Sequence, residues 1–291
     1  MDLEKPFRWD LTRRNQLGKL IHGEKTKTYD GFLDQLLRCC ARVMAVAGDS
    51  DLIFVGRSPE SIFDHLSGLL LNTSWFERVE LLHFSMGLER PPWQWEVSAI
   101  SRKHVKSLRS YLGRLDLHPE GIATRKRHVA FVDLVSSGDT FSSLITLIHN
   151  WTGDIGYDWN AVNRRIRLIG ITKRTKTSPK TWRWQQHATK LPPGTRGSVK
   201  NVSVPWELWH YLGDYQEKVV QSYIPSRWGD PALTSPSYDE SQLRALRLAY
   251  ELFELGQRRE RRRAFASLLV QQPAMKLGWF RALAREIRLT T

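Results

Sequence analysis

The stretch from His128 to Leu144 reads HVAFVDLVSSGDTFSSL, and its pattern decides the fold. An apolar run of strand length ends in Asp133, a turn of small residues follows, and an apolar stretch of helical spacing begins at Thr140. The amides of such a turn and the positive end of the helix dipole converge on one point, where they favour an anion. We therefore expect a strand and a helix joined by a phosphate-binding turn that consists of Ser136, Ser137, Gly138, Asp139 and Thr140.

The same local pattern is also found in ordinary turns whose serines cap a helix, so the neighbouring chain has to separate the two interpretations. Apolar runs typical of buried strands lie at 51–55, 78–84, 128–133 and 167–172. Stretches of helical spacing lie between them and before them, at 29–47, 62–71 and 140–151. This alternation predicts an α/β fold with a parallel sheet and right-handed crossovers.

The segments outside this core differ in composition. We expect an N-terminal arm at 1–28, the α/β core at 29–172, a basic and aromatic hood or flap at 173–240, and C-terminal helices at 241–291. The tryptophans of the hood either stack on a ligand ring or form the hood's own core, and they are Trp182, Trp184, Trp206 and Trp209. The run from Arg258 to Arg263 either contacts nucleic acid or covers a helix surface. The sequence leaves both choices open.

Charge and cysteine content restrict the class of partner and the compartment. The 291 residues include 44 Lys and Arg against 30 Asp and Glu, and the net charge of +14 favours polyanions such as nucleic acid, acidic membranes or polyphosphate metabolites. The only cysteines are the adjacent Cys39 and Cys40, so no disulfide framework is expected. With no apolar segment of signal or membrane-spanning length, we expect a soluble cytoplasmic protein without a membrane partner.

The stretch around Gly138 resembles the phosphoribosyl pyrophosphate motif of the type I phosphoribosyltransferases. In that motif an apolar strand leads to two acids, two apolar residues, a Thr or Ser pair, Gly, any residue and Thr. The matching positions are Asp133, Val135, Ser136, Ser137, Gly138 and Thr140. The resemblance implies that 136–140 hold the ribose 5-phosphate and that Asp133 binds the ribose hydroxyls. The chain departs from the motif at Val132, where the family has its first acid, and at Ser136, which is an acid in purine-specific members.

A second segment is similar to the family's pyrophosphate-binding loop. The run at 51–55 is followed by Gly56-Arg57-Ser58-Pro59-Glu60-Ser61. The resemblance implies that the Arg57 guanidinium contacts the pyrophosphate, while Ser58, Glu60 and Ser61 lie at a helix N-terminus that faces the same charge. An isolated arginine at such a place is more often part of a surface salt bridge. The order of segments through residues 51–172 is the family's order, which favours the first interpretation.

The family also has a flexible loop that closes over the reacting centre, located between the second strand and the strand that ends in Asp133. The candidates here are basic residues, namely Arg102, Lys103, His104, Lys106 and Arg109. A cation above the departing pyrophosphate lowers the barrier of a phosphoribosyl transfer, although a basic segment is also typical of a solvated helix face. Mg²⁺ is expected on the same logic, held mainly by substrate oxygens with no dedicated set of protein ligands.

Two functions of different classes follow. The first is a phosphoribosyltransferase that binds phosphoribosyl pyrophosphate with Mg²⁺ and transfers the phosphoribosyl group to a nitrogenous acceptor, releasing pyrophosphate. The second is a non-catalytic module of the same fold that senses a phosphate ligand or binds nucleic acid, which Val132 and the net charge favour. The sequence has no GxxxxGK[ST] and no cluster of zinc-ligand spacing. It leaves open the identity of the acceptor and whether the chain forms a homodimer.

Overall fold

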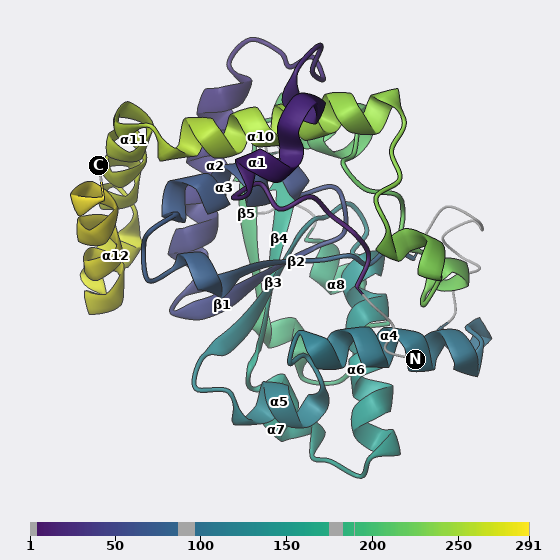
Figure 1. Cartoon of the computed structure of the whole chain (residues 1–291). Helices are drawn as coiled ribbons and strands as arrows, with labels where there is room; N and C mark the ends of the chain where they lie inside the picture. Colours follow the sequence, from purple (N-terminus) through teal and green to yellow (C-terminus); the bar gives the residue numbers. More distant parts are fainter. Residues whose placement is uncertain (1–4, 87–96, 175–182, 189, 291) are drawn as a thin grey trace.

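The central strands are filled with branched and aromatic apolar residues, as expected for a sheet that is covered on both faces. The computed structural model, which describes residues 5–86, 97–174, 183–188 and 190–290, has one five-stranded sheet in the order β2-β1-β3-β4-β5 (Figure 1). All neighbouring strands are parallel. The strands are β1 (Ser50–Val55), β2 (Val79–Leu82), β3 (His128–Leu134), β4 (Ile166–Lys173) and β5 (Val199–Val204). The predicted α/β fold with a parallel sheet is therefore confirmed.

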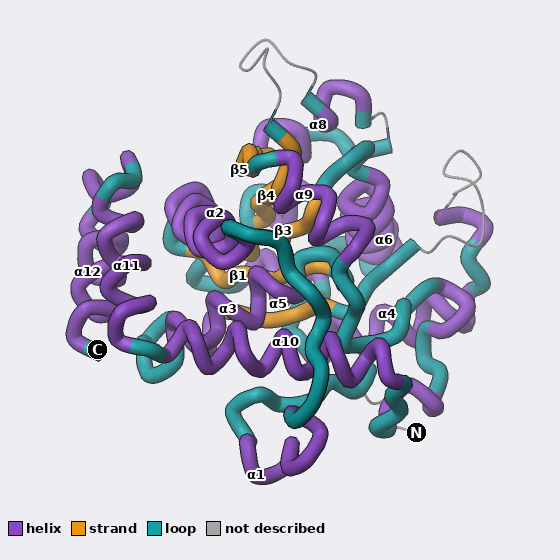
Figure 2. The backbone as a smooth tube through the Cα atoms, turned by 90° about the horizontal axis from the view of Figure 1, so that it is seen from above, coloured by secondary structure: helices purple, strands orange, loops and turns teal. Residues whose placement is uncertain are grey.

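Helices cover both faces of the sheet and give three layers. One face packs against α2 (Phe32–Ala47), α3 (Glu60–Leu70) and α9 (Trp206–His210). The other face packs against α4 (Arg102–Arg114), α5 (Pro119–Thr124), α6 (Asp139–Asp154), α7 (Trp159–Asn163) and α8 (Trp184–His187). Figure 2 shows α2 and α6 on opposite sides of the strands. In the described part of the chain, no helix has the length and apolar character needed to cross a membrane.

The sheet extends beyond residue 172, where the sequence placed the end of the core. Strand β5 lies within the segment predicted as a hood, and it pairs with β4 at the edge of the sheet. In its sequence, VKNVSV, the polar residues Lys200, Asn201 and Ser203 interrupt the apolar ones. An edge strand can carry such residues because it is covered less completely than a central strand. That pattern lacks the continuous apolar run by which the other strands were recognised.

The C-terminal helices form a second shell over α3. Helix α10 (Glu240–Gln257) begins with a capping box between Asp239 and Gln242, and it lies across α3. The two helices cross so closely that a Cβ atom on Gly68 would lie 2.1 Å from the Phe253 carbonyl oxygen, so only glycine fits there. The helical stretch predicted after Arg258 consists of α11 (Arg259–Val270) and α12 (Gly278–Leu289), and Figure 2 shows this pair together at one end of the molecule.

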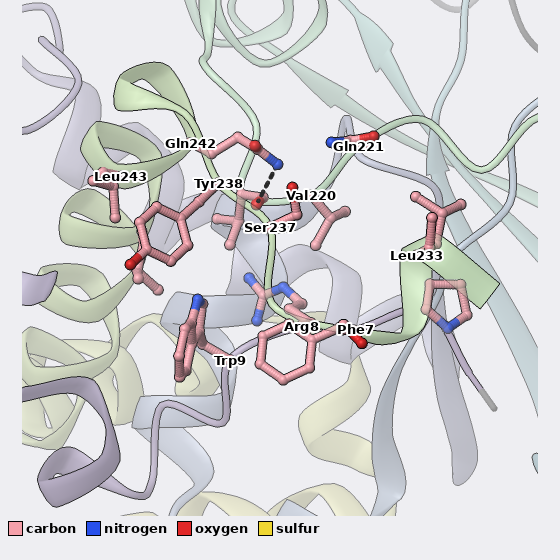
Figure 3. Close-up of a pocket in the computed structure, with 15 residues that line it drawn as sticks. Phe7, Arg8, Trp9, Val220, Gln221, Leu233, Ser237, Tyr238, Gln242 and Leu243 are labelled. Carbon is pink, nitrogen blue, oxygen red and sulfur yellow. Dashed lines mark hydrogen bonds between the residues drawn. The ribbon is translucent and has the colours of Figure 1, made fainter. Parts of the chain in front are cut away.

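The N-terminal arm packs on the core. It contains α1 (Arg14–Leu17), and its Arg8 guanidinium donates to both carboxylate oxygens of Asp64 on α3, at 2.6 and 2.8 Å. Figure 3 shows Arg8 beside Trp9 and below Val220, where a cavity of about 30 Å³ remains. That volume admits a water molecule but no larger ligand. The cavity is thus too small for a ligand site, and the buried Arg8–Asp64 ion pair attaches the arm to α3.

Replacing Arg8 with Ala is expected to lower the free energy of unfolding by about 3 to 5 kcal/mol, because Asp64 would keep a buried and unpaired charge. Arg13→Ala is the matched control, since the Arg13–Asp10 pair is 60% and 45% exposed and should contribute less than about 1 kcal/mol. Urea unfolding of the two variants at neutral pH measures the difference. Equal destabilisation would contradict the role assigned to Arg8.

Candidate functional site

The chain reverses its direction across the sheet between β1 and β3. From β1 it crosses to β2 on one side, and from β3 it crosses to β4 on the other. Phe54 pairs with Val132, so the two strands end at the same level of the carboxyl edge. The loops that follow β1 and β3 thus leave in opposite directions, and this switch point is the usual place for a ligand crevice in an open α/β sheet.

The loop after β3 presents an open helix N-terminus. Gly138 adopts φ +89°, which favours glycine, and no side chain caps α6. Among the described residues, no backbone or side-chain acceptor is found for the N–H groups of Ser136 through Thr140. Ser136, Ser137 and Asp139 are exposed, and the Ser137 hydroxyl donates to Asp139 Oδ2 at 2.6 Å. The turn can therefore offer unpaired amides and hydroxyls to an anion.

Trp184 closes the back of this turn. A Cβ atom on Gly138 would lie 2.1 Å from Cε3 of the indole, so only glycine lets the ring approach this closely. The ring is 1% exposed, and its Nε1 donates to Asn201 Oδ1 at 2.9 Å. Trp184 is therefore part of the core and has no free face for a ligand. Trp182 lies outside the described residues.

Asp133 is buried at the end of β3. Its Oδ1 accepts from the Leu134 N–H at 2.7 Å, and the Thr140 hydroxyl donates to the same carboxyl. Burial raises the pKa of Asp133 to about 8, and the two hydrogen bonds and the Lys218 ammonium oppose that rise. The structure thus places the Asp133 carboxyl group and the Thr140 hydroxyl side by side.

The loop after β1 is held close to the neighbouring chain. Gly56 adopts φ +76°, and a Cβ atom there would lie 2.9 Å from the Phe84 carbonyl oxygen. Arg57 is half-buried, and its Nη1 donates to the Val220 carbonyl at 3.4 Å. This bond is long, so the guanidinium keeps most of its donors for another partner.

The residues after Arg57 differ in how far they are available to a ligand. Ser58 is half-buried, whereas Ser61 is buried within the first turn of α3. Glu60 is also buried, and its Oε2 accepts from the Val219 N–H at 3.1 Å while Oε1 has no partner. Burial raises the pKa of Glu60 to about 7, opposed by Arg8 and Lys218. Glu60 therefore holds the segment around Val219 in place, and its side chain does not extend outward to a pyrophosphate.

The segment 212–223 lies beside the loop after β1, since Val219 and Val220 contact Glu60 and Arg57. It contributes Lys218, which was not predicted from the sequence. Its Nζ donates to the Leu212 carbonyl at 2.6 Å and lies near Asp133, Glu60 and Asp214. Burial lowers the pKa of Lys218 to about 8. No motif marks this single lysine in the sequence, because its role depends on where a distant loop crosses the sheet.

The three candidates for a flexible loop lie on a helix. Helix α4 begins at Arg102, since the Ser101 hydroxyl accepts from the His104 N–H at 3.3 Å and the apolar Leu108 and Leu112 bury one face. Arg102, Lys103 and Lys106 are exposed on its first turns. At these residues the structure has the solvated helix face that was the alternative to a flexible loop. Residues 87–96, between β2 and α4, lie outside the described part of the chain.

Part of the basic run from Arg258 to Arg263 has a structural role. Arg261 Nε donates to the buried His65 Nε2 at 3.1 Å, and the buried Arg262 donates to the Leu71 carbonyl at 2.7 Å. Both bonds hold α11 against α3. Arg258, Arg259 and Arg263 remain exposed.

An aromatic cavity of about 950 Å³ lies beside the segment that carries Lys218. Its wall includes five rings, which are those of Tyr29, Trp206, His210, Tyr211 and Tyr215. Trp206 and Tyr215 are 54% and 68% exposed, and both rings contact the imidazole of His210. The cavity is therefore suited to a planar ring.

Neither similarity to known proteins nor a group of metal ligands identifies the chemistry of this site. Comparisons with family models, with curated proteins and with solved structures find no match to this chain. Within residues 5–86, 97–174, 183–188 and 190–290, no cluster of three or more His, Cys, Asp or Glu side chains is placed to hold a metal ion. The chemistry of the site is therefore inferred from its own geometry.

Asp133→Asn is expected to stabilise the folded protein increasingly as the pH rises. An unfolded aspartate ionises near pH 3.8 and the folded one near pH 8, so between these values the wild type loses stability as the pH rises. The variant lacks this loss, and its advantage should reach on the order of a few kcal/mol at pH 8. Urea unfolding at pH 5 and pH 8 tests this, with the exposed Asp154→Asn as a control. An advantage that does not grow with pH would contradict the burial argument.

Gly138→Ala is expected to destabilise the protein by more than about 2 kcal/mol, because the methyl group meets the Trp184 ring and the backbone is strained at φ +89°. Gly153→Ala lies on the same helix in open space, so it should be neutral or stabilising by up to about 1 kcal/mol. Thermal unfolding and near-ultraviolet circular dichroism of the tryptophans report both effects. Similar values for the two variants would exclude the close contact.

Proposed function

We propose that the protein is a divergent phosphoribosyltransferase that binds phosphoribosyl pyrophosphate in the crevice between β1 and β3 and transfers its phosphoribosyl group to a nitrogenous acceptor. One observation carries the proposal. The loops at Arg57 and at Asp133 to Thr140 were both predicted to bind phosphates, and they follow adjacent parallel strands at the point where the chain reverses direction.

The open N-terminus of α6 supports the assignment of the 5-phosphate to 136–140. Its unpaired amides and the Ser136 hydroxyl offer donors from one side, with the helix dipole behind them, and the Ser137 hydroxyl could join them by leaving Asp139. Asp133 lies directly before this turn, where its carboxyl group would accept hydrogen bonds from the ribose hydroxyls. Val132 is buried in the sheet, so the single acid Asp133 carries this role alone.

Arg57 and Lys218 supply positive charge on the other side of the crevice. In the proposed reaction the bond between ribose C1 and the pyrophosphate oxygen breaks, the oxygen keeps the electron pair, and the acceptor nitrogen forms the new bond to C1. Negative charge grows on the departing pyrophosphate, so cations fixed beside it stabilise the transition state. Since Lys218 is already held by Leu212 and neighbouring carboxyl groups, little reorganisation would be needed.

Magnesium fits this site as a partner of the ligand. The carboxyl groups nearest the crevice, Asp133 and Asp139, are too few to form a complete oxygen shell. The diphosphate would provide most of the oxygens, and the ion would neutralise its charge. The aromatic cavity favours a planar nitrogen heterocycle as the acceptor. Tyr211, Tyr215 and Glu217 line this cavity, and Lys218, which follows them directly, lies near Asp133.

Isothermal calorimetry with phosphoribosyl pyrophosphate and Mg²⁺ tests the proposal. The wild type should bind, and Asp133→Asn should weaken binding by about tenfold, since the amide has one acceptor oxygen fewer for the ribose hydroxyls. Asp154→Asn, at the far end of α6, should leave the affinity unchanged. Because Asp133→Asn is expected to be the more stable protein at pH 8, a loss of affinity there cannot arise from unfolding.

Absence of binding by the wild type at millimolar ligand would exclude the proposal, as would equal affinities of the wild type and Asp133→Asn. Release of pyrophosphate upon addition of purine or pyrimidine bases then separates the transferase from a sensor. A protein that binds phosphoribosyl pyrophosphate but releases no pyrophosphate with any base would be the non-catalytic module.

A further inference from the structure

A basic groove lies at the amino edge of the sheet, opposite to the crevice at Asp133. Two neighbouring cavities of about 460 and 480 Å³ share His128 and Arg164 in their walls. His128 begins β3, Arg167 is the second residue of β4, and Lys200 is the second residue of β5. Figure 1 shows α5 and α7, which precede β3 and β4, at the bottom of the view and α10 across the top. We name these two cavities the amino-edge groove.

The walls of the amino-edge groove contain basic residues and no acidic residue. The cations are Arg164, Arg165, Arg167 and Lys200. Among the described residues, Arg164, Arg165 and Lys200 have no partner in an ion pair, and Arg164 and Lys200 are exposed. A protein gains no stability from like charges that lie together on a surface, so their grouping needs an external counterpart.

One guanidinium of the groove is fixed by the backbone, and the positive charges act on the neighbouring His128. Arg167 Nη1 donates to the Ala47 carbonyl at 2.7 Å, which fixes this guanidinium at the groove. Burial, together with Arg167 and Arg165, lowers the pKa of His128. The nearby acid Asp49 is itself bound to Arg78 at 2.6 Å, so it neutralises the groove only in part.

The groove has the features of a surface that binds a phosphate backbone. No aromatic ring belongs to its walls, so it lacks the stacking platform with which proteins hold single strands. Lys126 is exposed and extends the positive surface beyond the cavities, whereas the neighbouring Arg127 pairs with Asp49 at 3.7 Å. Duplexes, in contrast to single strands, are bound largely through phosphates and sugars.

We propose that the amino-edge groove binds the phosphate backbone of a nucleic-acid duplex. This site is separate from the crevice between β1 and β3, and it stands whether or not the protein transfers a phosphoribosyl group. The three unpaired cations predict the release of about three counterions. The affinity should then fall by about 40-fold between 50 and 200 mM salt.

Fluorescence anisotropy with short labelled RNA and DNA duplexes tests the site. The double variant Arg164→Glu/Arg165→Glu should bind at least tenfold more weakly than the wild type and show a smaller salt dependence. The matched control is Arg258→Glu/Arg259→Glu, which makes the same change of charge at exposed positions on the opposite part of the molecule. Circular dichroism verifies that both variants fold.

Three results would overturn the proposal. These are no duplex binding at 50 mM salt, binding that salt does not weaken, and equal losses in the two double variants. Vesicles of anionic phospholipid are a further arm of the experiment. If they bind through Arg164 and Arg165 while duplexes do not, the groove is a membrane contact. Inorganic pyrophosphate that binds at the groove and is not displaced by duplex would identify a small anion as the ligand.

Discussion

The parallel pairing of β1 with β3 is the constraint on which the rest of the molecule depends. It brings two loops from distant parts of the sequence to one level of the carboxyl edge, at the point where the crossovers run in opposite directions. Because helices cover both faces of the sheet, only its edges remain for polar chemistry. The carboxyl edge therefore holds the proposed phosphoribosyl site, and the amino edge holds the basic groove.

The segment that closes the carboxyl edge determines the electrostatics of the site. It brings Lys218 to Asp133 and Glu60, and burial moves the pKa values of all three groups to between about 7 and 8. Protonation of the cluster can then respond to an anionic ligand near neutral pH. The arrangement is costly for the free protein, since buried carboxyl groups are harder to ionise. A site that lowers stability in this way is typical of function.

The sequence predicted the parts of the fold that rest on continuous apolar runs or clear helical spacing, namely β1 to β4 and helices α2, α3 and α6, whereas α5 and α7 were not predicted. It missed β5, whose apolar residues are interrupted by Lys200, Asn201 and Ser203, and it left Arg102, Lys103 and Lys106 open between a flexible loop and a solvated helix face. The residues of the turn at Ser136 to Thr140 could be named because the motif is local. Lys218 could not be named, and the role of Trp184 stayed open, since each acts through a contact that only the folded chain creates.

The central claim is that the turn after β3 receives phosphoryl oxygens. Amide chemical shifts measured by NMR during titration with ribose 5-phosphate test this most directly. The account predicts that the amides of Ser136 to Thr140 and of Arg57 shift together and saturate, while those of Gly153, at the far end of α6, stay in place. Shifts confined to the amino edge, or no saturable change at the turn, would contradict it.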